Sequence, residues 1–279
     1  MEPITANSAE IVRRSGSNLA FALAVLPKSK RRDMTVFYAF CRVVDDLADD
    51  PGLGSEERQA GLNRWRELIE GGATEVLPGL ESEFVDLCSR RDLNADELDA
   101  IVRGVEMDLE PRKIQTADEL KEYCYHVASA VGLVSIDIFE YEDPATRDYA
   151  EQLGYALQWT NIMRDVGEDA GEGRIFLPQE DLATFGVSED EILNKNPDPE
   201  SFRNLMAHEA DVARGFYRKA VELLPEVDRK SMRSAELMRR IYSGILEQMG
   251  ADGYRVFEKR YRLSKVRMLG EFLRAKLIG

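Results

Sequence analysis

The chain has 279 residues and a formal net charge of −15 at pH 7, and 44% of its residues are hydrophobic. So acidic a chain lacks the basic footprint of a nucleic-acid-binding protein, which excludes nucleic acid as a partner. The longest unbroken apolar run, Leu19 to Leu26, is far too short to cross a bilayer.

Helical patterns with clear stop signals fill nearly the whole chain. Beyond Asp169, a glycine-rich loop, AGEGRIFLPQEDL, either closes over a ligand or simply connects two helices. Strand-like alternation is absent, so residues 1–279 are predicted to form one all-α domain, a helical bundle. Helices are predicted from about Ser8 to Pro27, Ser29 to Asp50, Ser55 to Gly71, Pro78 to Arg91, Asn94 to Glu110, Thr116 to Tyr141, Asp143 to Asp169, a short one capped by Ser188, Pro199 to Leu224, and Val227 to Gly250.

A polar stripe runs along the second predicted helix. Tyr38, Arg42, Asp45 and Asp49 are spaced by four, three and four residues, which places them on one face. Apolar residues cover the rest of this helix. The alternative to a functional stripe is an ordinary solvated helix end, since Pro51 and Gly52 follow directly.

The predicted helix at 116–141 carries a tyrosine followed by small residues on one face: Tyr125, Ala128, Ser129 and Gly132. Such a strip indicates close helix packing. The alternative is a groove for a bulky apolar ligand, with Tyr125 at its polar end.

A second polar stripe runs along the helix that ends at Asp169. Gln158, Asn161, Asp165 and Asp169 fall within roughly 80° of one another, together with Gly154, on a helix that is otherwise apolar nearly all round. Such a helix is normally buried, so its carboxylates are expected to face the interior.

Neither aspartate pair is specific alone, because acidic residues four apart should occur roughly ten times by chance in this composition. Together, with matching polar neighbours, the two pairs predict an enclosed cavity filled by cations, since buried carboxylates without partners are costly. Mg²⁺ suits such pairs, with substrate phosphates completing its coordination. Arg42 and Arg164 add positive charge for a diphosphate, and an apolar bundle interior suits a hydrocarbon.

Three segments carry a resemblance to a known family: YAFCRVVDDLAD, YCYHVASAVG and LQWTNIMRDVGEDAGEGRIFLP. They closely resemble the signature segments of the squalene/phytoene synthase family, in the same order, over most of the chain. The chain looks most like the bacterial hopanoid-pathway members that make presqualene diphosphate from two farnesyl diphosphates. The resemblance implies an isoprenoid-synthase fold with a central cavity and a Mg²⁺-dependent head-to-head condensation.

The resemblance also implies roles for individual residues. Ser17 would contact phosphate, although Asn18 and Leu19 stand where the family often has Ser-Phe. Tyr125 would line the reaction centre, and Ser129 stands where Gly is common. The magnesium ligands would be Asp45, Asp49, Asn161, Asp165 and Asp169, of which the aspartates with Tyr125 form the catalytic set. The residues that would bind or orient diphosphate are Tyr38, Arg42, Gln158, Arg164, Tyr242 and Arg260.

Several alternatives stay open from the sequence. The chain could act on geranylgeranyl diphosphate as a phytoene synthase, carry the reaction on to squalene or dehydrosqualene, or be a non-catalytic member of the fold, against which both aspartate pairs weigh. Use of NADPH is open, because no Rossmann glycine signature is present but family members that use NADPH lack one. The oligomeric state is open.

The cysteines and the C-terminal tail bear on localisation. Cys41, Cys88 and Cys124 lack metal-ligand spacing and are expected to be reduced core thiols, as in a cytoplasmic protein. The start lacks the apolar core of a secretory signal, and the chain lacks the C-terminal membrane anchor of eukaryotic squalene synthases, which favours a bacterial-type enzyme. From Ala251 onward eight basic residues oppose three acidic ones, so this tail is expected to touch an anionic ligand or, peripherally, a membrane surface.

Overall fold

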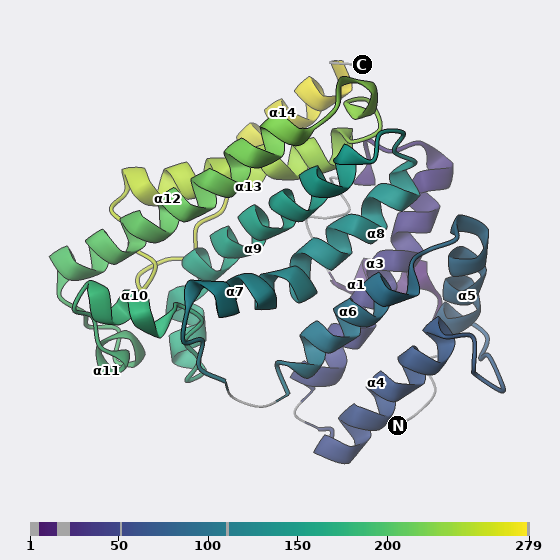
Figure 1. Ribbon diagram of the computed structural model, residues 1–279, viewed down its shortest axis with the longest axis horizontal. Coiled ribbons are helices and arrows are strands. Elements are labelled where there is room, and N and C mark those ends of the chain that lie inside the picture. Colours follow the sequence, from purple (N-terminus) through teal and green to yellow (C-terminus); the bar gives the residue numbers. More distant parts are fainter. Residues whose placement is uncertain (1–5, 16–22, 51, 110–111, 278–279) are drawn as a thin grey trace.

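The computed structural model describes residues 6–15, 23–50, 52–109 and 112–277, and within them it contains helices and no strand (Figure 1). The all-α class is confirmed. In chain order the elements are α1 (Ser8–Ser15), α3 (Lys28–Asp49), α4 (Ser55–Ile69), α5 (Leu80–Arg91), α6 (Ala95–Glu106), α7 (Ala117–Cys124), the π-helical turn η1 (Tyr125–Ser129), α8 (Ala130–Phe139), α9 (Ala145–Gly171), α10 (Gln179–Thr184), α11 (Glu189–Leu193), α12 (Pro199–Leu223), the short 3₁₀ turn η2 (Glu226–Asp228), α13 (Arg233–Ala251) and α14 (Lys265–Leu277).

Capping residues fix several helix starts where the sequence predicts them. The Thr116 hydroxyl accepts a hydrogen bond from the Glu119 amide at 3.2 Å, which opens α7. Ser188 and Glu191 form a reciprocal capping box at the start of α11. These side chains satisfy amide groups that have no partner inside the helix.

Helix α9 is the central element of the bundle. It packs against α7, η1, α8, α11, α12 and α13, and its apolar residues are buried around most of its circumference. Trp159 is 2% exposed and donates from its indole nitrogen to Glu209 on α12, at 2.8 Å. The prediction of a buried helix is confirmed, because buried apolar residues cover most of its surface.

The predicted long helix at 116–141 is wrong in one respect. It is interrupted at Tyr125–Ser129, where the backbone forms a π-helical turn between α7 and α8. The turn packs against α6 and α9, and a Cβ atom added to Gly154 of α9 would lie 2.4 Å from the Ser129 Cα. Insertion of one residue into a helix re-aims the side chains around it, so tertiary packing and not local pattern decided this turn.

Helix α3 belongs to the other half of the bundle, where it packs against α1, α4, α5, α6 and α8. Aromatic rings fix it there. The Phe40 ring stacks on Phe84 at 4.4 Å between centroids and meets Trp65 edge-on at 5.2 Å. At its N-terminal end, buried Asp33 is paired with Arg90 and Arg91 of α5. The orientation of α3 is therefore set by both an apolar and an ionic contact.

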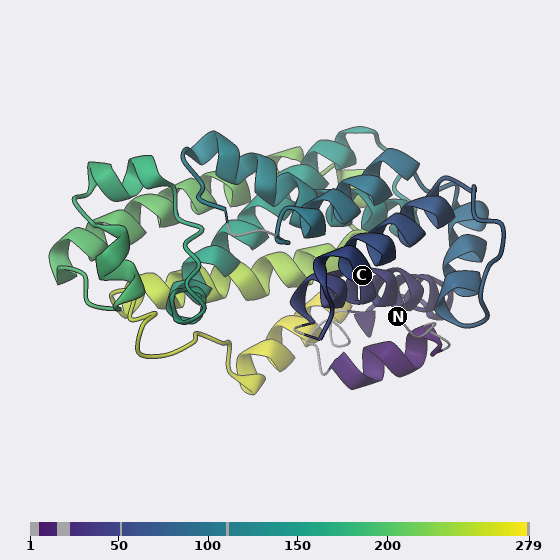
Figure 2. The ribbon, with the colours of Figure 1, turned by 90° about the horizontal axis from the view of Figure 1, so that it is seen from below.

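The C-terminal segment contains a helix that was not predicted from the sequence, where only its positive charge was noted. It forms α14, which lies along the outside of the bundle next to α13 (Figures 1 and 2). Helix α13 begins at Arg233, after a 3₁₀ turn and a short bend, and not at Val227. No helix among the described ranges combines the length and the apolarity that a membrane span requires.

Candidate active site

The first polar stripe lies at the C-terminal end of α3. Arg42 donates to Asp45, with 3.4 Å between Nη1 and Oδ2, and also pairs with Asp46. The Asp45 side chain is 54% exposed, and Asp49 is exposed too. The expectation that all four carboxylates are enclosed is wrong for this stripe, because α3 ends two residues after Leu47, its last buried residue, so solvent reaches its final turn.

Asp45 nevertheless lacks full charge compensation. Burial among protein atoms and the negative charge of Asp49 together raise the pKa of its carboxyl to about 6, and Arg42 offsets only part of the rise. Tyr38, two turns earlier, is half-buried on the same face. A solvent-accessible carboxylate that repels its neighbour suits a bound cation.

In the second stripe, Asp165 is held by two arginines. Arg164 donates to both carboxylate oxygens, at 2.8 Å and 2.6 Å, and Arg260 approaches both at 3.0 Å. The Asp165 side chain is only 18% exposed. Two guanidinium groups thus converge on one half-buried site, although Arg260 lies 95 residues further along the chain.

Arg164 and Arg260 also have partners beyond Asp165. The Arg164 guanidinium lies over the Tyr242 ring, 5.9 Å from its centroid, and Arg260 is 3.0 Å from Glu168. The structure therefore brings together four residues for which the family resemblance implied roles: Arg164 and Asp165 from α9, Tyr242 from α13, and Arg260 from the segment after α13.

The other polar groups of the stripe on α9 lack full charge compensation or a hydrogen-bond partner. Burial, together with the negative charge of Asp165, raises the pKa of Asp169 to about 7, although Arg174 at 3.9 Å offsets part of the rise. The Asn161 amide donates to Gln158 at 3.3 Å, while its buried carbonyl oxygen has no hydrogen-bond partner. An unpartnered acceptor one turn before Asp165 is chemically suited to a cation.

Three residues that the sequence interpretation missed link the stripes electrostatically: Asp108, Tyr123 and Arg174. The Tyr123 hydroxyl donates to Asp108 at 3.1 Å. The pKa of Asp108 is raised to about 6, because burial and the charges of Asp45 and Asp49 outweigh the opposing effects of Tyr123 and Arg174. Burial raises the pKa of Tyr123 as well, and the charges of Asp108 and Asp169 add to it.

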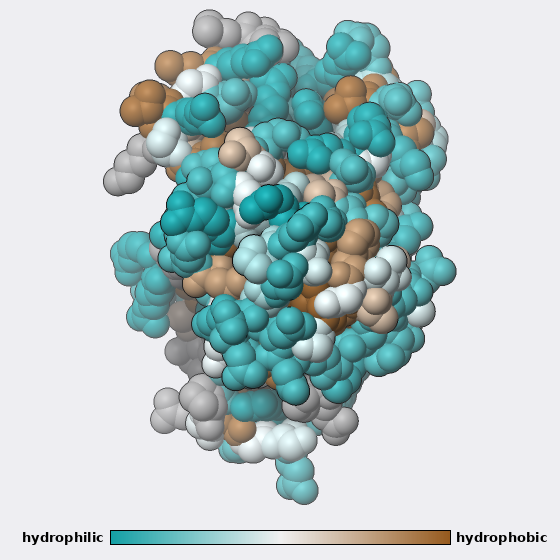
Figure 3. All heavy atoms as spheres, turned by 90° about the vertical axis from the view of Figure 1, so that its left-hand side faces the viewer, coloured by the Kyte–Doolittle hydropathy of each residue, from teal (hydrophilic) through white to brown (hydrophobic). Residues whose placement is uncertain are grey.

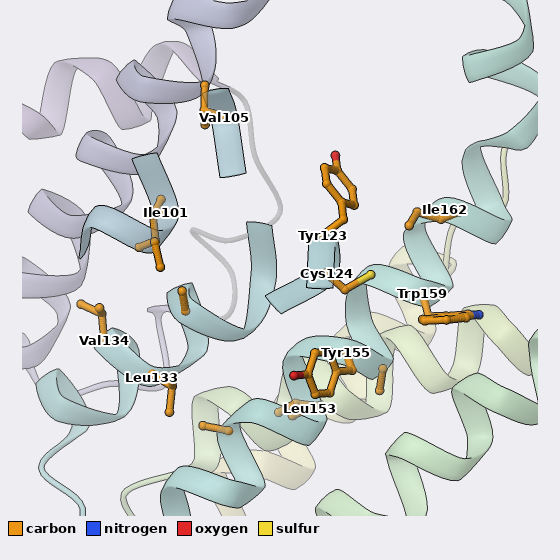
Figure 4. Close-up of a cluster of buried hydrophobic side chains, with 14 of the residues drawn as sticks. Ile101, Val105, Tyr123, Cys124, Leu133, Val134, Leu153, Tyr155, Trp159 and Ile162 are labelled. Atoms are coloured by element: carbon orange, nitrogen blue, oxygen red, sulfur yellow. The ribbon is translucent and has the colours of Figure 1, made fainter. Parts of the chain in front are cut away.

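Tyr123 lies between the two halves of the bundle, facing the space between Val105 of α6 and Ile162 of α9 (Figure 4). In the sequence, the only signal for this pair was the position of Tyr123, two residues before Tyr125 in the segment YCYHV. Asp108 gave no signal, because it lies on neither of the two predicted helices that carry the stripes. The charges of Asp45 and Asp49 raise the pKa of Asp108, and the charge of Asp169 raises the pKa of Tyr123. The ends of both stripes therefore act on the same hydrogen-bonded pair.

Tyr125 stands apart from the two stripes. The half-buried Tyr125 lies in the π-helical turn, where burial raises its pKa and the charges of Glu97 and Glu151 raise it further. No aspartate of either stripe is among the groups acting on it. Ser17 lies outside the described residues.

The donor set suits Mg²⁺, which prefers oxygen ligands and typically takes one or two carboxylates together with phosphates and waters. Within the described ranges, no three or more His, Cys, Asp or Glu side chains are gathered as a ready-made metal site. The unpartnered Asn161 oxygen and the repelling pair on α3 are consistent with ligands shared between protein and substrate.

Two clefts lie elsewhere, along α13 and α14, with volumes of about 610 Å³ and 350 Å³. No residue of either stripe lines them, so the central cavity stays a prediction. The end of the molecule at which α10 and α11 lie is mainly hydrophilic, with small apolar areas between the charged side chains (Figure 3).

Comparison with known proteins supplies the family. A model of the family described as squalene/phytoene synthase matches residues 12–267. A presqualene diphosphate synthase of Zymomonas mobilis subsp. mobilis is 32% identical over 273 residues, covering 97% of this chain and 93% of that protein. A chloroplastic phytoene synthase of an Oncidium hybrid cultivar is also 32% identical, over 88% of this chain, which spans 61% of the Oncidium protein's length.

A solved structure agrees with these matches. The squalene synthase HpnC from Alicyclobacillus acidocaldarius superposes with a TM-score of 0.80 at 26% sequence identity, covering 88% of this chain and 93% of that one. The helical arrangement described above is therefore that of squalene synthases.

Proposed function

The chain belongs to the squalene/phytoene synthase family, whose members are prenyltransferases, and from that premise we propose that it condenses two farnesyl diphosphates head to head into presqualene diphosphate. The observation that carries the proposal is the convergence of Arg164 and Arg260 on Asp165, with the Tyr242 ring under the Arg164 guanidinium. A planar guanidinium group can bind two phosphate oxygens at once. Two guanidinium groups beside a carboxylate therefore suit a diphosphate with its bound cation.

In the proposed reaction, the bond between C1 and the diphosphate oxygen of one substrate breaks. The allylic C1 cation is captured by the C2–C3 double bond of the second substrate, and loss of a proton closes the cyclopropane. Asp45, Asp49, Asn161, Asp165 and Asp169 would hold Mg²⁺, which neutralises charge on the departing oxygens.

The chain's own residues would supply binding and orientation. Arg164 and Arg260 would release Asp165 and bind the diphosphate instead. The same guanidinium N–H groups that donate to the Asp165 carboxylate can donate to phosphate oxygens. Tyr38, Arg42 and Gln158 would orient the second diphosphate. Tyr125 would face the hydrocarbon near the reacting carbons.

The second candidate is phytoene synthesis from geranylgeranyl diphosphate, because the Oncidium phytoene synthase is as similar in sequence as the presqualene diphosphate synthase. Both reactions begin at the same kind of diphosphate and metal groups, so the length of the apolar pocket would decide which substrate is accepted.

Incubation of the purified protein with farnesyl or geranylgeranyl diphosphate, with and without Mg²⁺ and NADPH, tests the proposal. We expect presqualene diphosphate from farnesyl diphosphate, strictly dependent on Mg²⁺, and NADPH should reveal whether squalene follows. Phytoene or its diphosphate precursor from geranylgeranyl diphosphate alone would favour the second candidate. Turnover of neither substrate would refute both.

A further inference from the structure

Helix α14 presents an apolar face to solvent. Val266, Leu269 and Leu273 are 81%, 52% and 50% exposed, and their spacing of three and four residues puts them on one side of the helix. The other large hydrophobic side chains that are exposed in the described part of the chain, Val76, Val221 and Val227, lie on three different segments. A concentrated apolar face on one helix calls for a partner.

The opposite side of α14 is fixed to the protein. Ala275 is 7% exposed, and Phe272 packs against the hydrophobic core. Glu271 faces Arg240 of α13 at 3.7 Å. The helix is thus docked along α13 by one side (Figure 2), and its exposed apolar residues lie on the other side.

Positive charge accompanies the apolar face. By sequence, α14 carries four basic residues against one acidic residue, in a chain whose net charge is −15. The exposed arginines Arg267 and Arg274 also line the two clefts between α13 and α14. Arg262 lines the larger cleft and Arg239 and Arg240 the smaller one, with carboxylates only from Glu247 and Glu271.

We propose that α14 is a membrane-docking helix that lies in the plane of an anionic lipid bilayer, with Val266, Leu269 and Leu273 among the acyl chains and Arg267 and Arg274 at the headgroup phosphates. A helix with an apolar face bordered by arginines binds such an interface in two ways: the apolar side chains are buried among the acyl chains, and the arginines are attracted to the anionic headgroups. The acidic body would be repelled by the same surface, so docking is confined to this face.

A second copy of the chain is the weaker occupant. Three aliphatic side chains cover only a small part of the roughly 800 Å² per partner that a stable interface buries. The docking surface is independent of the proposed reaction, so either can fail without the other.

Flotation of the full-length protein with phosphatidylglycerol vesicles, and with phosphatidylcholine vesicles as the neutral reference, tests the proposal. We expect binding to the anionic vesicles that weakens as salt rises. The double variant Leu269→Ser/Leu273→Ser should bind about a hundredfold more weakly, and Arg267→Gln/Arg274→Gln about 25-fold more weakly. All four residues are exposed, so circular dichroism should show unchanged helix content.

The matched control is Val221→Ser/Val227→Ser, which removes two equally exposed apolar side chains elsewhere and should bind like the wild type. Three results would overturn the proposal: no binding of the wild type to phosphatidylglycerol vesicles, equal loss in the control, or a concentration-dependent dimer in solution that the Leu269→Ser/Leu273→Ser variant abolishes.

Discussion

Asp165 and the two arginines bound to it form the most constrained contact of the candidate site. Both carboxylate oxygens already accept charge-assisted hydrogen bonds from Arg164 and Arg260. In the proposed reaction these donors transfer to diphosphate, so Asp165 both holds the arginines in place beforehand and becomes free to bind Mg²⁺ afterwards.

Asp165→Asn should lower kcat/KM for farnesyl diphosphate at least about a hundredfold, because the neutral amide neither binds Mg²⁺ well nor orients both arginines. Steady-state kinetics at saturating Mg²⁺ measures the effect. Glu168→Gln is the matched control, since Glu168 contacts the same Arg260 from an exposed position and should change kcat/KM only a few-fold. Near-normal activity of the Asn variant would remove the metal assignment.

A second prediction concerns Asp169, whose charged form the native protein disfavours. Its pKa is raised from 3.8 to about 7, so between these values the native state holds a proton that the unfolded chain has released. The free energy of unfolding of the metal-free protein therefore falls as the pH rises through this window, by up to about 4 kcal/mol at about 1.4 kcal/mol per pKa unit.

Asp169→Asn should thus stabilise the metal-free protein at about pH 8 and leave its stability nearly unchanged at about pH 4, where the wild-type carboxyl is largely protonated. Urea unfolding at both pH values measures the difference. The same variant should lose activity and any stabilisation by added Mg²⁺. A variant less stable than the wild type at the higher pH would contradict the electrostatic account.

At the scale of elements, the crossing of α9 with the π-helical turn depends on Gly154. Its missing side chain lets the backbone of α9 approach Ser129, and the Ser129 hydroxyl donates to the Glu151 carbonyl oxygen at 2.9 Å. A single methyl group has no room there, because the Cα and N atoms of the Ser129 backbone and its Oγ would lie within 2.7 Å of the added carbon.

Gly154→Ala should lower the free energy of unfolding by roughly 2–3 kcal/mol, despite the better helix propensity of alanine. Gly215→Ala in α12 is the matched control, since its nearest neighbour is the end of the Arg218 side chain at 3.9 Å, and we expect it to be neutral or slightly stabilising. Thermal or urea unfolding distinguishes the two. If both variants changed the free energy of unfolding equally, α9 and the π-helical turn could move apart without loss of stability, which would contradict the prediction.

For the whole molecule, the notable feature is that two halves of the bundle share one electrostatic environment. Helix α3 contributes one stripe and α9 the other, while Asp108 and Tyr123 lie between them. Arg174, in the loop after α9, lowers the pKa of both Asp108 and Asp169. That loop therefore contributes a positive charge near both carboxyls.

Arg174→Gln should move the acidic limb of the pH profile of kcat/KM upward by about one pH unit, because both carboxyls would hold their protons to a higher pH. Arg103→Gln is the control, because Arg103 pairs with Asp99 on the surface of α6. The profile of the control should match the wild type. An unshifted profile for Arg174→Gln would separate the loop from the site.

The sequence alone determined what depends on local spacing. Its helical periodicity and caps gave the all-α class and most helix positions, and the spacing of Asp45, Asp49, Asp165 and Asp169 gave the two stripes. Family resemblance added Tyr242 and Arg260, which no spacing connects to Asp165. Periodicity within one helix is a property of neighbouring residues, so a sequence shows it directly.

Tertiary structure alone decided what depends on contacts between distant segments. Asp108 and Tyr123 acquired their environment from α3 and α9, the exposure of Asp45 followed from where the core ends, and the π-helical turn followed from packing against Gly154. The outward face of α14 likewise became visible only once its other side was docked on α13. Burial and long-range charge interactions arise when the chain is folded, and for that reason no local pattern contained them.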